Sequence, residues 1–490
     1  MNFKADWSFL EKISMGAVSS KQVIKLLNDA GHDVIELERY STSNKIWATK
    51  IKRLRIPDLI CLKCGRRIES RAKSKLEIKM SDNEKNPDRR WDAGLRDEDL
   101  IAFIKCRAHN GEWIPGEDVN LFSVESLKQT YSDSKTGKTK SAYEGAEKDR
   151  TWPSSTPSKD GTIDKIIRKN GKLQIKVRYV DGRNYCFSIK EEKHYNSYCE
   201  EGDTFIGGET IIAGVPPQKE RIDACNAGYD FLNDIKSDVK EIRYAGVKAL
   251  GYLDKKPEYI NELMKLKNIE TDCRIQLEIY SSLIRLGVDV WDEFCEFAMS
   301  DIEDEYRLEF VLILGELEKE KRVSKILHNI AVNRGFKDEL RAAAAWGIKV
   351  DDTTLPSLIE IAKSEVDTVA SHALAHIIDN FEDEYTSDLV KLINDDCSGG
   401  IVLKILTEAD VVKAETLVDI YRALTDNFQK KWVAMSIGFS GKKKYGNWED
   451  TIEKVDIQNF SIIKELWDYS TSSIDAEKSS EIIFLRKQCL

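Results

Sequence analysis

The feature that most constrains the fold is a repeat of about 30 residues in the second half of the chain. Five segments with the apolar spacing of a helix each carry an aspartate near their start. These are Asp238, Asp272, Asp304, Asp338 and Asp367, and they lie 34, 32, 34 and 29 residues apart. Each interval is long enough for one helical hairpin. An aspartate at a helix start can cap the helix and complements its dipole, so these residues are expected to be structural.

The first repeat also has small residues where two helices must approach closely. Its pattern consists of Ile242-Arg243, Ala245 and Ala249-Leu250-Gly251. This pattern closely resembles a HEAT-type motif. The resemblance implies an α-solenoid of HEAT-like repeats over residues 217–490, with an extended concave surface for a protein partner.

The first 124 residues change between helical and strand patterns. Residues 19–30 have the apolar spacing of a helix that stops at Gly31, and alternating segments typical of strands follow. The order is one helix, three strands, a polar connection and a further strand. This order predicts an α/β domain over residues 1–124.

Two different segments separate this domain from the repeats. Residues 125–160 are rich in Ser, Lys, Gly and Thr, which predicts a polar linker. Residues 161–216 alternate like strands around an Asn-Gly and an Asp-Gly turn signal. They predict a small all-β, barrel-like domain that is either a binding module or a spacer. The chain is therefore expected to be multidomain, with α/β, all-β and α-solenoid parts.

Charge is distributed unevenly along the chain. Residues 45–79 contain twelve Lys and Arg but only three acids, an excess of +9 that leaves −19 for the rest of a chain with net charge −10. A basic block on an acidic body is typical of a protein that binds a polyanion, although a solvated basic hairpin has the same charges. The three acids, Asp58, Glu69 and Glu77, are then candidates to hold a cation or to form ordinary ion pairs.

These acids fit the pattern of metal-dependent phosphodiester cleavage. Glu77 and Lys79 lie two residues apart on a predicted strand, so they share one face while Ile78 faces a core. Asp58 begins the preceding strand. Two carboxylates on adjacent strands can hold Mg²⁺ beside a phosphate, and a lysine can orient the attacking water or stabilise developing charge.

Pro57-Asp58 and Glu77-Ile78-Lys79, with the preceding helix and strand, resemble the PD-(D/E)XK nuclease superfamily over about the first 110 residues. The resemblance implies a restriction-endonuclease-like fold and an endonuclease that depends on Mg²⁺ or Mn²⁺. It implies that Asp58 and Glu77 bind the metal and that Lys79 is catalytic.

A second register is also open, in which Glu69 and Lys73 take these roles. Glu69 lies eleven residues after Asp58, and it shares a predicted strand face with Arg71 and Lys73. The Glu-x-Lys form is broken here, because position 71 is Arg and Ser70 replaces the apolar middle residue. If one long strand runs through both registers, all these odd-numbered side chains share one face.

Further basic and aromatic residues are candidates for contact with nucleic acid, since Arg and Lys can contact phosphates and Trp can stack on a base. They are Arg53, Arg55, Arg66, Arg67, Arg71, Lys75, Arg89, Arg90 and Trp91. A salt-bridged helix start would explain the last three equally well.

A metal site of another kind is indicated by cysteines. Cys61-Leu-Lys-Cys64-Gly65 resembles a zinc knuckle, and Cys106 with His109 supplies a second pair of ligands. Together they make a Cys₃His set suited to structural Zn²⁺. However, 41 residues separate the two pairs, and in the resembled fold they lie toward opposite ends of the sheet. Two unrelated pairs of buried thiols are the alternative.

No run of eighteen apolar residues occurs, and the charged N-terminus lacks the apolar core of a signal peptide, so a cytoplasmic protein without a membrane span is expected. The resemblances imply a DNA endonuclease of bacterial restriction or anti-phage defence, with the solenoid as a partner-binding or regulatory module. Many such nucleases act as homodimers. The alternative is a non-catalytic nucleic-acid-binding adaptor that uses the solenoid for protein interaction.

Overall fold

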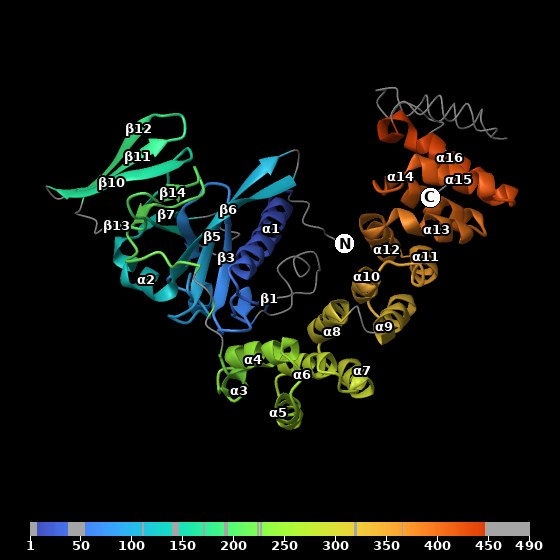
Figure 1. Cartoon of the computed structure of the whole chain (residues 1–490). Helices are drawn as coiled ribbons and strands as arrows, with labels where there is room; N and C mark the ends of the chain where they lie inside the picture. Colours follow the sequence, from blue (N-terminus) through green and yellow to red (C-terminus); the bar gives the residue numbers. More distant parts are fainter. Residues whose placement is uncertain are drawn as a thin grey trace. The chain divides into compact units, whose positions relative to one another are not determined.

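The computed structural model describes residues 7–37, 54–109, 112–139, 147–169, 172–190, 195–222, 225, 228–317, 321–364 and 366–445. The chain divides into two compact units, Met1–Ser300 and Asp301–Leu490 (Figure 1). The first unit contains α/β and β structure followed by helices, and the second is helical where it is described. None of the described helices combines the length and the apolar character needed to span a membrane.

A mixed five-stranded sheet forms the centre of the first unit. Its strands are β1 (Val34–Glu36), β2 (Leu59–Cys61), β3 (Arg67–Lys73), β5 (Leu100–His109) and β6 (Glu112–Ser123), in the spatial order β1-β2-β3-β5-β6. Neighbouring strands are antiparallel except for β3 and β5, which are parallel. The N-terminal α/β prediction is confirmed at this level.

Two apolar cores cover the two faces of this sheet. Helix α1 (Trp7–Asp29) packs against β3, β5 and β6. Its Val23 and Leu27, four residues apart on one helix face, belong to the same core as Ile68 of β3. Gly31, at φ +91°, follows the end of the helix in the left-handed conformation that favours glycine. Phe103 is fully buried in the core on the opposite face.

The segment predicted to be a polar linker contains secondary structure. It includes most of α2 (Val124–Gln129), then β7 (Lys135–Thr139), β8 (Lys148–Trp152) and β9 (Ser154–Ser155). β8 pairs with β7 and with β4 (Ile78–Asp82). The sequence gives no clear signal for these strands, because few of their side chains are buried and most are polar. Trp152 is fully buried and its Nε1 donates to the Leu127 carbonyl at 3.1 Å.

The following segment forms two further sheets. One contains β12 (Asn184–Lys190), β11 (Lys172–Tyr179), β10 (Gly161–Lys169) and β14 (Thr204–Phe205), in that order. The other contains β13 (Asn196–Ser197), β15 (Ala213–Gly214) and β9. The Asp-Gly turn joins β11 to β12, with Gly182 at φ +80°.

Five helices complete the first unit. They are α3 (Phe231–Asp234), α4 (Lys240–Tyr252), α5 (Pro257–Lys267), α6 (Cys273–Arg285) and α7 (Trp291–Met299). α4 and α5 both pack against α6. The buried ammonium group of Lys248 in α4 donates to the carbonyl of Leu37, the residue after β1, at 3.2 Å. This bond connects the helices of the first unit to its central sheet.

The second unit contains α8 (Asp304–Glu316), α9 (Lys321–Val332), α10 (Asp338–Gly347), α11 (Leu355–Ala362), α12 (Asp367–Asn380), α13 (Thr386–Lys391), α14 (Asp396–Glu408), α15 (Ala414–Ala423) and α16 (Asn427–Tyr445). Alternate helices pack in succession, α8 on α10, α10 on α12, α12 on α14 and α14 on α16. The prediction of many helices in this part is confirmed.

The repeated aspartates lie at or just before the starts of α4, α6, α8, α10 and α12. Among them Asp272 is a true N-cap, since its Oδ1 accepts from the backbone amides of Arg274 and Ile275 at 3.0 and 3.3 Å. Asp304 is already the first helical residue, and it forms an ion pair with Arg307 at 3.1 Å. The repeat therefore marks helix starts, although it does not always cap them.

Candidate functional site

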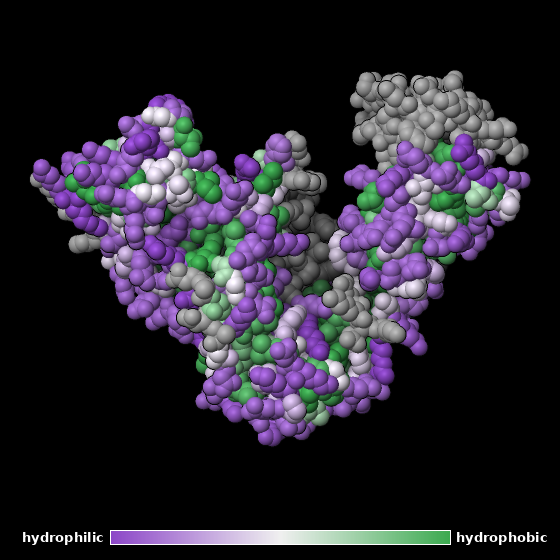
Figure 2. Space-filling model, viewed as in Figure 1, coloured by the Kyte–Doolittle hydropathy of each residue, from purple (hydrophilic) through white to green (hydrophobic). Residues whose placement is uncertain are grey.

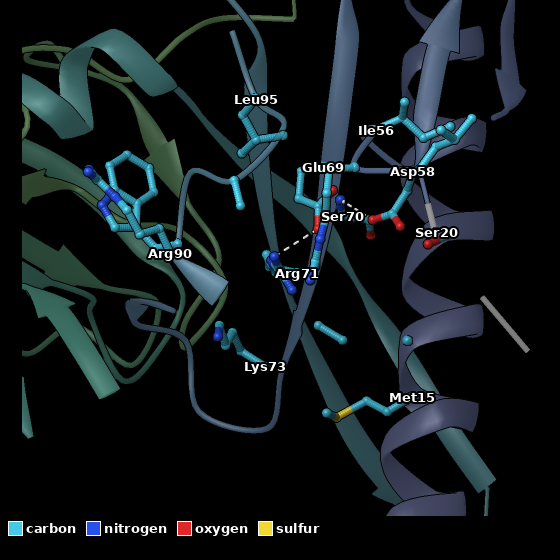
Figure 3. A pocket seen from close by; sticks show the side chains of 16 residues that line it. Met15, Ser20, Ile56, Asp58, Glu69, Ser70, Arg71, Lys73, Arg90 and Leu95 are labelled. Carbon is cyan, nitrogen blue, oxygen red and sulfur yellow. Dashed lines mark hydrogen bonds and ion pairs between the residues drawn. The ribbon is translucent and has the colours of Figure 1, made fainter. Parts of the chain in front are cut away.

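A cavity of about 380 Å³ lies beside the β2–β3 hairpin and gathers acidic and basic side chains (Figure 3). Its lining includes Asp58, Glu69, Arg71 and Lys73, together with Ser20 from α1. The cavity therefore brings Asp58, which precedes β2, together with Glu69 and Lys73 of β3, the residues of the second register.

Asp58 is held in place by the neighbouring strand. The pairing of Leu59 with Ile68 in antiparallel β2 and β3 places Asp58, the residue just before β2, next to Glu69 and Ser70. Its Oδ2 accepts a hydrogen bond from the Ser70 amide at 2.7 Å. The Ser70 hydroxyl in turn lies 3.0 Å from that of Ser19 in α1. Backbone pairing and α1 together thus fix the position of the Asp58 carboxylate.

Glu69 and Arg71 share one face of β3, as their spacing requires. Arg71 Nη2 lies 2.8 Å from Glu69 Oε1, and the Glu69 side chain is 13% exposed against 41% for Arg71 (Figure 3). The arginine at the position where the motif has lysine therefore neutralises the adjacent carboxylate. A cation that bound Glu69 would compete with this ion pair.

Lys73 lies at the end of β3. Its Nζ donates to the backbone carbonyl of Lys79 and lies 5.8 Å from the centre of the Phe103 ring. Lys73 is also one of the residues that line the cavity.

Glu77 and Lys79 are not brought to this cavity. β3 ends at Lys73, and β4 begins at Ile78 in a different sheet, where it pairs with β8. Glu77 instead forms an ion pair with Lys75 at 2.8 Å, and Lys79 forms one with Asp149 at 3.2 Å.

The possibility that one long strand runs through both registers is therefore excluded, because β3 and β4 are separate strands. The chain turns away after Lys73 because Leu76, Ile78 and Met80 are buried in the second core, opposite the α1 side of the central sheet. Ile78, the apolar middle residue of Glu77-Ile78-Lys79, is a core residue as predicted. However, its strand β4 belongs to a different sheet from β3.

Two of the residues expected to contact nucleic acid are buried. Arg67 Nε donates to Asp99 Oδ1 at 2.9 Å, and these two side chains are 3% and 0% exposed. Trp91 is 3% exposed and packs edge to face on Trp152, with the ring centres 5.2 Å apart. Contact with a phosphate or a base would require either residue to leave the core.

Among the remaining candidates, Arg71 is half-buried and five others are exposed. Arg55 and Arg90 line the cavity, and Arg90 also pairs with Asp92 at 3.1 Å. Arg66 and Lys75 lie on the surface, as does Arg89, which pairs with Glu147 at 3.4 Å. Arg53 lies outside the described residues.

A separate cluster of metal-binding side chains lies at the turn of the same hairpin. The ligand atoms of His32, Cys61, Cys64 and Cys225 all lie within 4.8 Å of one another. This donor set could hold a metal such as Zn²⁺. The Cys-x-x-Cys prediction is thus consistent with the structure, but its two partners are different from those expected.

The expected partners, Cys106 and His109, are not part of the cluster. Ile68, close to the turn, is level with Leu100 in the parallel pair β3–β5. Cys106 lies six residues farther along β5, which corresponds to roughly 20 Å at the rise of a strand. Its thiol is buried between the sheet and α1, and burial raises its pKa to about 11.

The sequence patterns do not single out either His32 or Cys225 as a ligand. His32 directly follows the helix stop at Gly31, so its local pattern indicated only a strand start. Cys225 lies 164 residues after Cys61, and no usual ligand spacing spans such a distance. Both were found only when the fold placed them beside the turn.

The surroundings of the cluster favour a thiolate on one of its members. Burial raises the pKa of Cys61, but hydrogen bonds, mainly from the backbone of Asp33 and Cys64 and from the His32 side chain, outweigh burial and lower this pKa to about 6. Burial raises the pKa of Cys64, and burial together with the neighbouring thiols raises that of Cys225 to about 12.

No protein-family model matches the chain, and no curated protein matches its sequence.

Proposed function

We propose that the chain is a metal-dependent phosphodiester hydrolase acting on nucleic acid, with DNA as the expected substrate and Asp58 and Glu69 as the cation ligands. One observation carries the proposal. Two carboxylates from adjacent antiparallel strands line the same cavity as Arg71 and Lys73. Anionic ligands for a cation and cationic groups for a phosphate are thus combined in one cavity.

The sheet topology supports this assignment. A leading helix packs on the sheet, three consecutive strands are antiparallel, and β5 then returns parallel to β3. In the sequence, the resemblance to PD-(D/E)XK nucleases rests on Pro57-Asp58 and Glu77-Ile78-Lys79, with the leading helix and first strand. It is here transferred to the register with Glu69, because Glu77 lies outside the cavity.

Each side chain has a role that its chemistry permits. Two carboxylates suffice for Mg²⁺, which keeps several waters and takes further ligands from the substrate phosphate. Such a cation supplies a more acidic water and neutralises charge on the phosphate. Arg71 remains protonated, so it can stabilise negative charge but cannot accept a proton. Lys73, at the end of β3, is the group to orient the attacking water.

A basic sheet face in the same unit supports a polyanionic substrate. Residues 161–190 contain eight Lys and Arg but two Asp. The register of β10, β11 and β12 places Ile175 and Val177 on the buried face, and it places the exposed Lys165, Lys172 and Lys176 on the other. Hydrophilic residues predominate in the visible surface of this part (Figure 2, upper left). Clustered cations on one face fit a phosphate backbone.

A non-catalytic adaptor is the second candidate, and the Arg71–Glu69 ion pair favours it. The Arg71 guanidinium group, 2.8 Å from Glu69, already neutralises the carboxylate that would otherwise bind a metal. In an adaptor the same cavity and the basic face would bind nucleic acid without cutting it.

The two candidates are separated by measuring cleavage and binding on the same variants. Asp58→Asn keeps an oxygen that can accept from Ser70, and Glu69→Gln keeps the side-chain shape. As an enzyme, the protein should nick plasmid DNA with Mg²⁺ or Mn²⁺, and each variant should lose about 10²–10³-fold in rate, the usual cost of a group that stabilises the transition state.

Glu77→Gln and Lys79→Ala are the matched controls, because both residues lie outside the cavity and Lys79→Ala retains the backbone carbonyl to which Lys73 donates. Both should retain cleavage. Loss of activity in the controls but not in Asp58→Asn would contradict the register. Fluorescence anisotropy with labelled DNA and RNA tests the adaptor, which predicts binding without metal-dependent cleavage for the wild type and all variants.

A further inference from the structure

We infer that His32, Cys61, Cys64 and Cys225 bind one Zn²⁺, which cross-links three segments far apart in the sequence. These are the loop after α1, the turn between β2 and β3, and the segment that leads into α3. The inference does not depend on the proposed phosphodiesterase activity.

Two of the distances between ligand atoms agree with a tetrahedral zinc site. With bonds of about 2.3 Å to sulfur and about 2.0 Å to nitrogen, a tetrahedron places neighbouring ligand atoms roughly 3.5–3.8 Å apart. Cys61 Sγ lies 3.6 Å from Cys225 Sγ, and Cys64 Sγ lies 3.8 Å from His32 Nδ1. Four protein ligands complete the coordination, which is typical of a structural rather than a catalytic zinc.

The β2–β3 turn has the backbone that a zinc knuckle requires. Gly65 adopts φ +69°, a conformation in which a residue with a side chain is strained. Its amide donates to the Cys61 carbonyl at 2.9 Å, and the Cys61 amide donates to the Arg66 carbonyl, also at 2.9 Å. Such backbone contacts hold a ligand in position.

The segment that contains Cys225 is fixed to this turn. The amides of Gly228 and Tyr229 donate to the Lys63 carbonyl at 3.0 and 3.1 Å. The Tyr229 ring covers Gly65 so closely that a Cβ at position 65 would lie 2.4 Å from Tyr229 Cγ. The fourth ligand is therefore positioned by backbone pairing and by ring packing.

The loop that contains His32 is fixed in the same way. The His32 amide donates to the Leu27 carbonyl at 3.1 Å, which continues the end of α1. Lys63 Nζ donates to the Gly31 carbonyl at 2.6 Å, and the Leu62 amide donates to the Asp33 carbonyl at 2.7 Å. All three segments thus converge through contacts that do not involve the metal, so the site is preorganised.

Buried thiols without a metal explain this arrangement less well. A disulfide between Cys61 and Cys225 would use two of the four donors and give no reason for Cys64 and His32 to face them. The cluster combines three soft sulfur donors with an imidazole, which is the set that selects Zn²⁺ among abundant divalent cations.

Zinc content measures the inference directly. Protein purified under reducing conditions is analysed by plasma mass spectrometry, and about one zinc per chain is expected. Cys225→Ser should weaken zinc binding by more than about 100-fold, beyond the cost of losing an outer-shell partner. Cys106→Ala and Cys397→Ser are the matched controls and should retain zinc. Unchanged zinc content in Cys225→Ser, or loss only in Cys106→Ala, would overturn the ligand set.

A titration of the wild type avoids the risk that a variant fails to fold. After chelation under reducing conditions, Co²⁺ is added and the visible spectrum is recorded. Strong bands of tetrahedral, thiolate-bound cobalt with an endpoint at one equivalent, and their displacement by Zn²⁺, are expected. An octahedral spectrum, no endpoint, or a Cys61–Cys225 disulfide that persists under reducing conditions would overturn the inference. Neither measurement involves nucleic acid, so it can fail independently of the proposed activity.

Discussion

The two ends of the β2–β3 hairpin have opposite chemistry. At the turn, the ligand atoms of three cysteines and one histidine lie within 4.8 Å of one another. At the other end, Asp58 accepts from a backbone amide, and Glu69 is already paired with Arg71. One end is a complete ligand set for a soft metal, whereas the other is a partly neutralised pair of hard ligands.

Under the two proposals, the metal at the turn is permanent and the metal at the other end is exchangeable. Four protein ligands leave no coordination position for substrate, so a metal at the turn can only hold the fold together. Two carboxylates leave most positions of Mg²⁺ to water and phosphate, so a metal at the other end is retained mainly when substrate is present. The short hairpin would then carry a structural and a working cation about three residues apart along β2.

Chelators should distinguish the two ends most strongly. Brief EDTA treatment is expected to abolish cleavage, which added Mg²⁺ restores, while the thermal unfolding temperature stays the same. Prolonged treatment with a thiophilic chelator should lower that temperature by at least about 10 °C, because structural zinc contributes about 10 kcal/mol or more in small domains and part of this persists in larger ones. Differential scanning calorimetry and plasmid nicking measure both effects.

The comparison would fail if both treatments changed stability equally. It would also fail if the zinc-depleted protein unfolded at the temperature of the untreated protein. Cys397→Ser, at an exposed thiol, should respond to each chelator as the wild type does.

Gly65→Ala should destabilise the turn between β2 and β3 without replacing any of the four proposed zinc ligands. The new Cβ would enter a left-handed conformation and would clash with the Tyr229 ring. We expect a loss of about 2–3 kcal/mol in the free energy of unfolding, measured with denaturant. Gly182→Ala is the matched control, since Gly182 also has a positive φ but nothing within 4 Å. An equal loss in both variants would show that the Tyr229 contact contributes nothing.

Arg71→Ala should have the smallest effect, on the acidic end. Removal of the guanidinium takes away the internal competitor for Glu69, so Mn²⁺ should bind tighter by about 1 kcal/mol, or roughly fivefold, as expected for a partly exposed ion pair. Isothermal titration calorimetry without nucleic acid measures this change. Arg89→Ala, which removes an exposed ion pair outside the cavity, should leave the affinity unchanged. Weaker Mn²⁺ binding in Arg71→Ala would argue that Arg71 orients Glu69 instead of blocking it.

Short-range sequence patterns predicted those parts of the fold that short-range interactions determine. The 3.6-residue spacing and the repeated aspartates indicated the helices, and the Asp-Gly pair indicated the turn at Gly182. Cys61 and Cys64 were recognisable because both lie in one turn.

What sequence could not supply was the pairing of distant segments. Whether the chain continued or turned after Lys73 depended on which of two cores would bury Leu76 and Ile78, and alternation alone is the same in both cases. The fourth thiol of the cluster depended on a contact across 164 residues. In each case the deciding free energy lies in tertiary packing, which no short window of sequence contains.

The long separation between Cys61 and Cys225 also sets an order of events during protein synthesis. A ribosome that adds about 5–20 residues per second needs on the order of 10–30 s to make the 164 residues between them. During that time the nascent hairpin has His32, Cys61 and Cys64 but not its fourth partner. The turn of this hairpin is thus completed late, after the sheets that intervene in the sequence have left the ribosome, although it is among the first segments to be made.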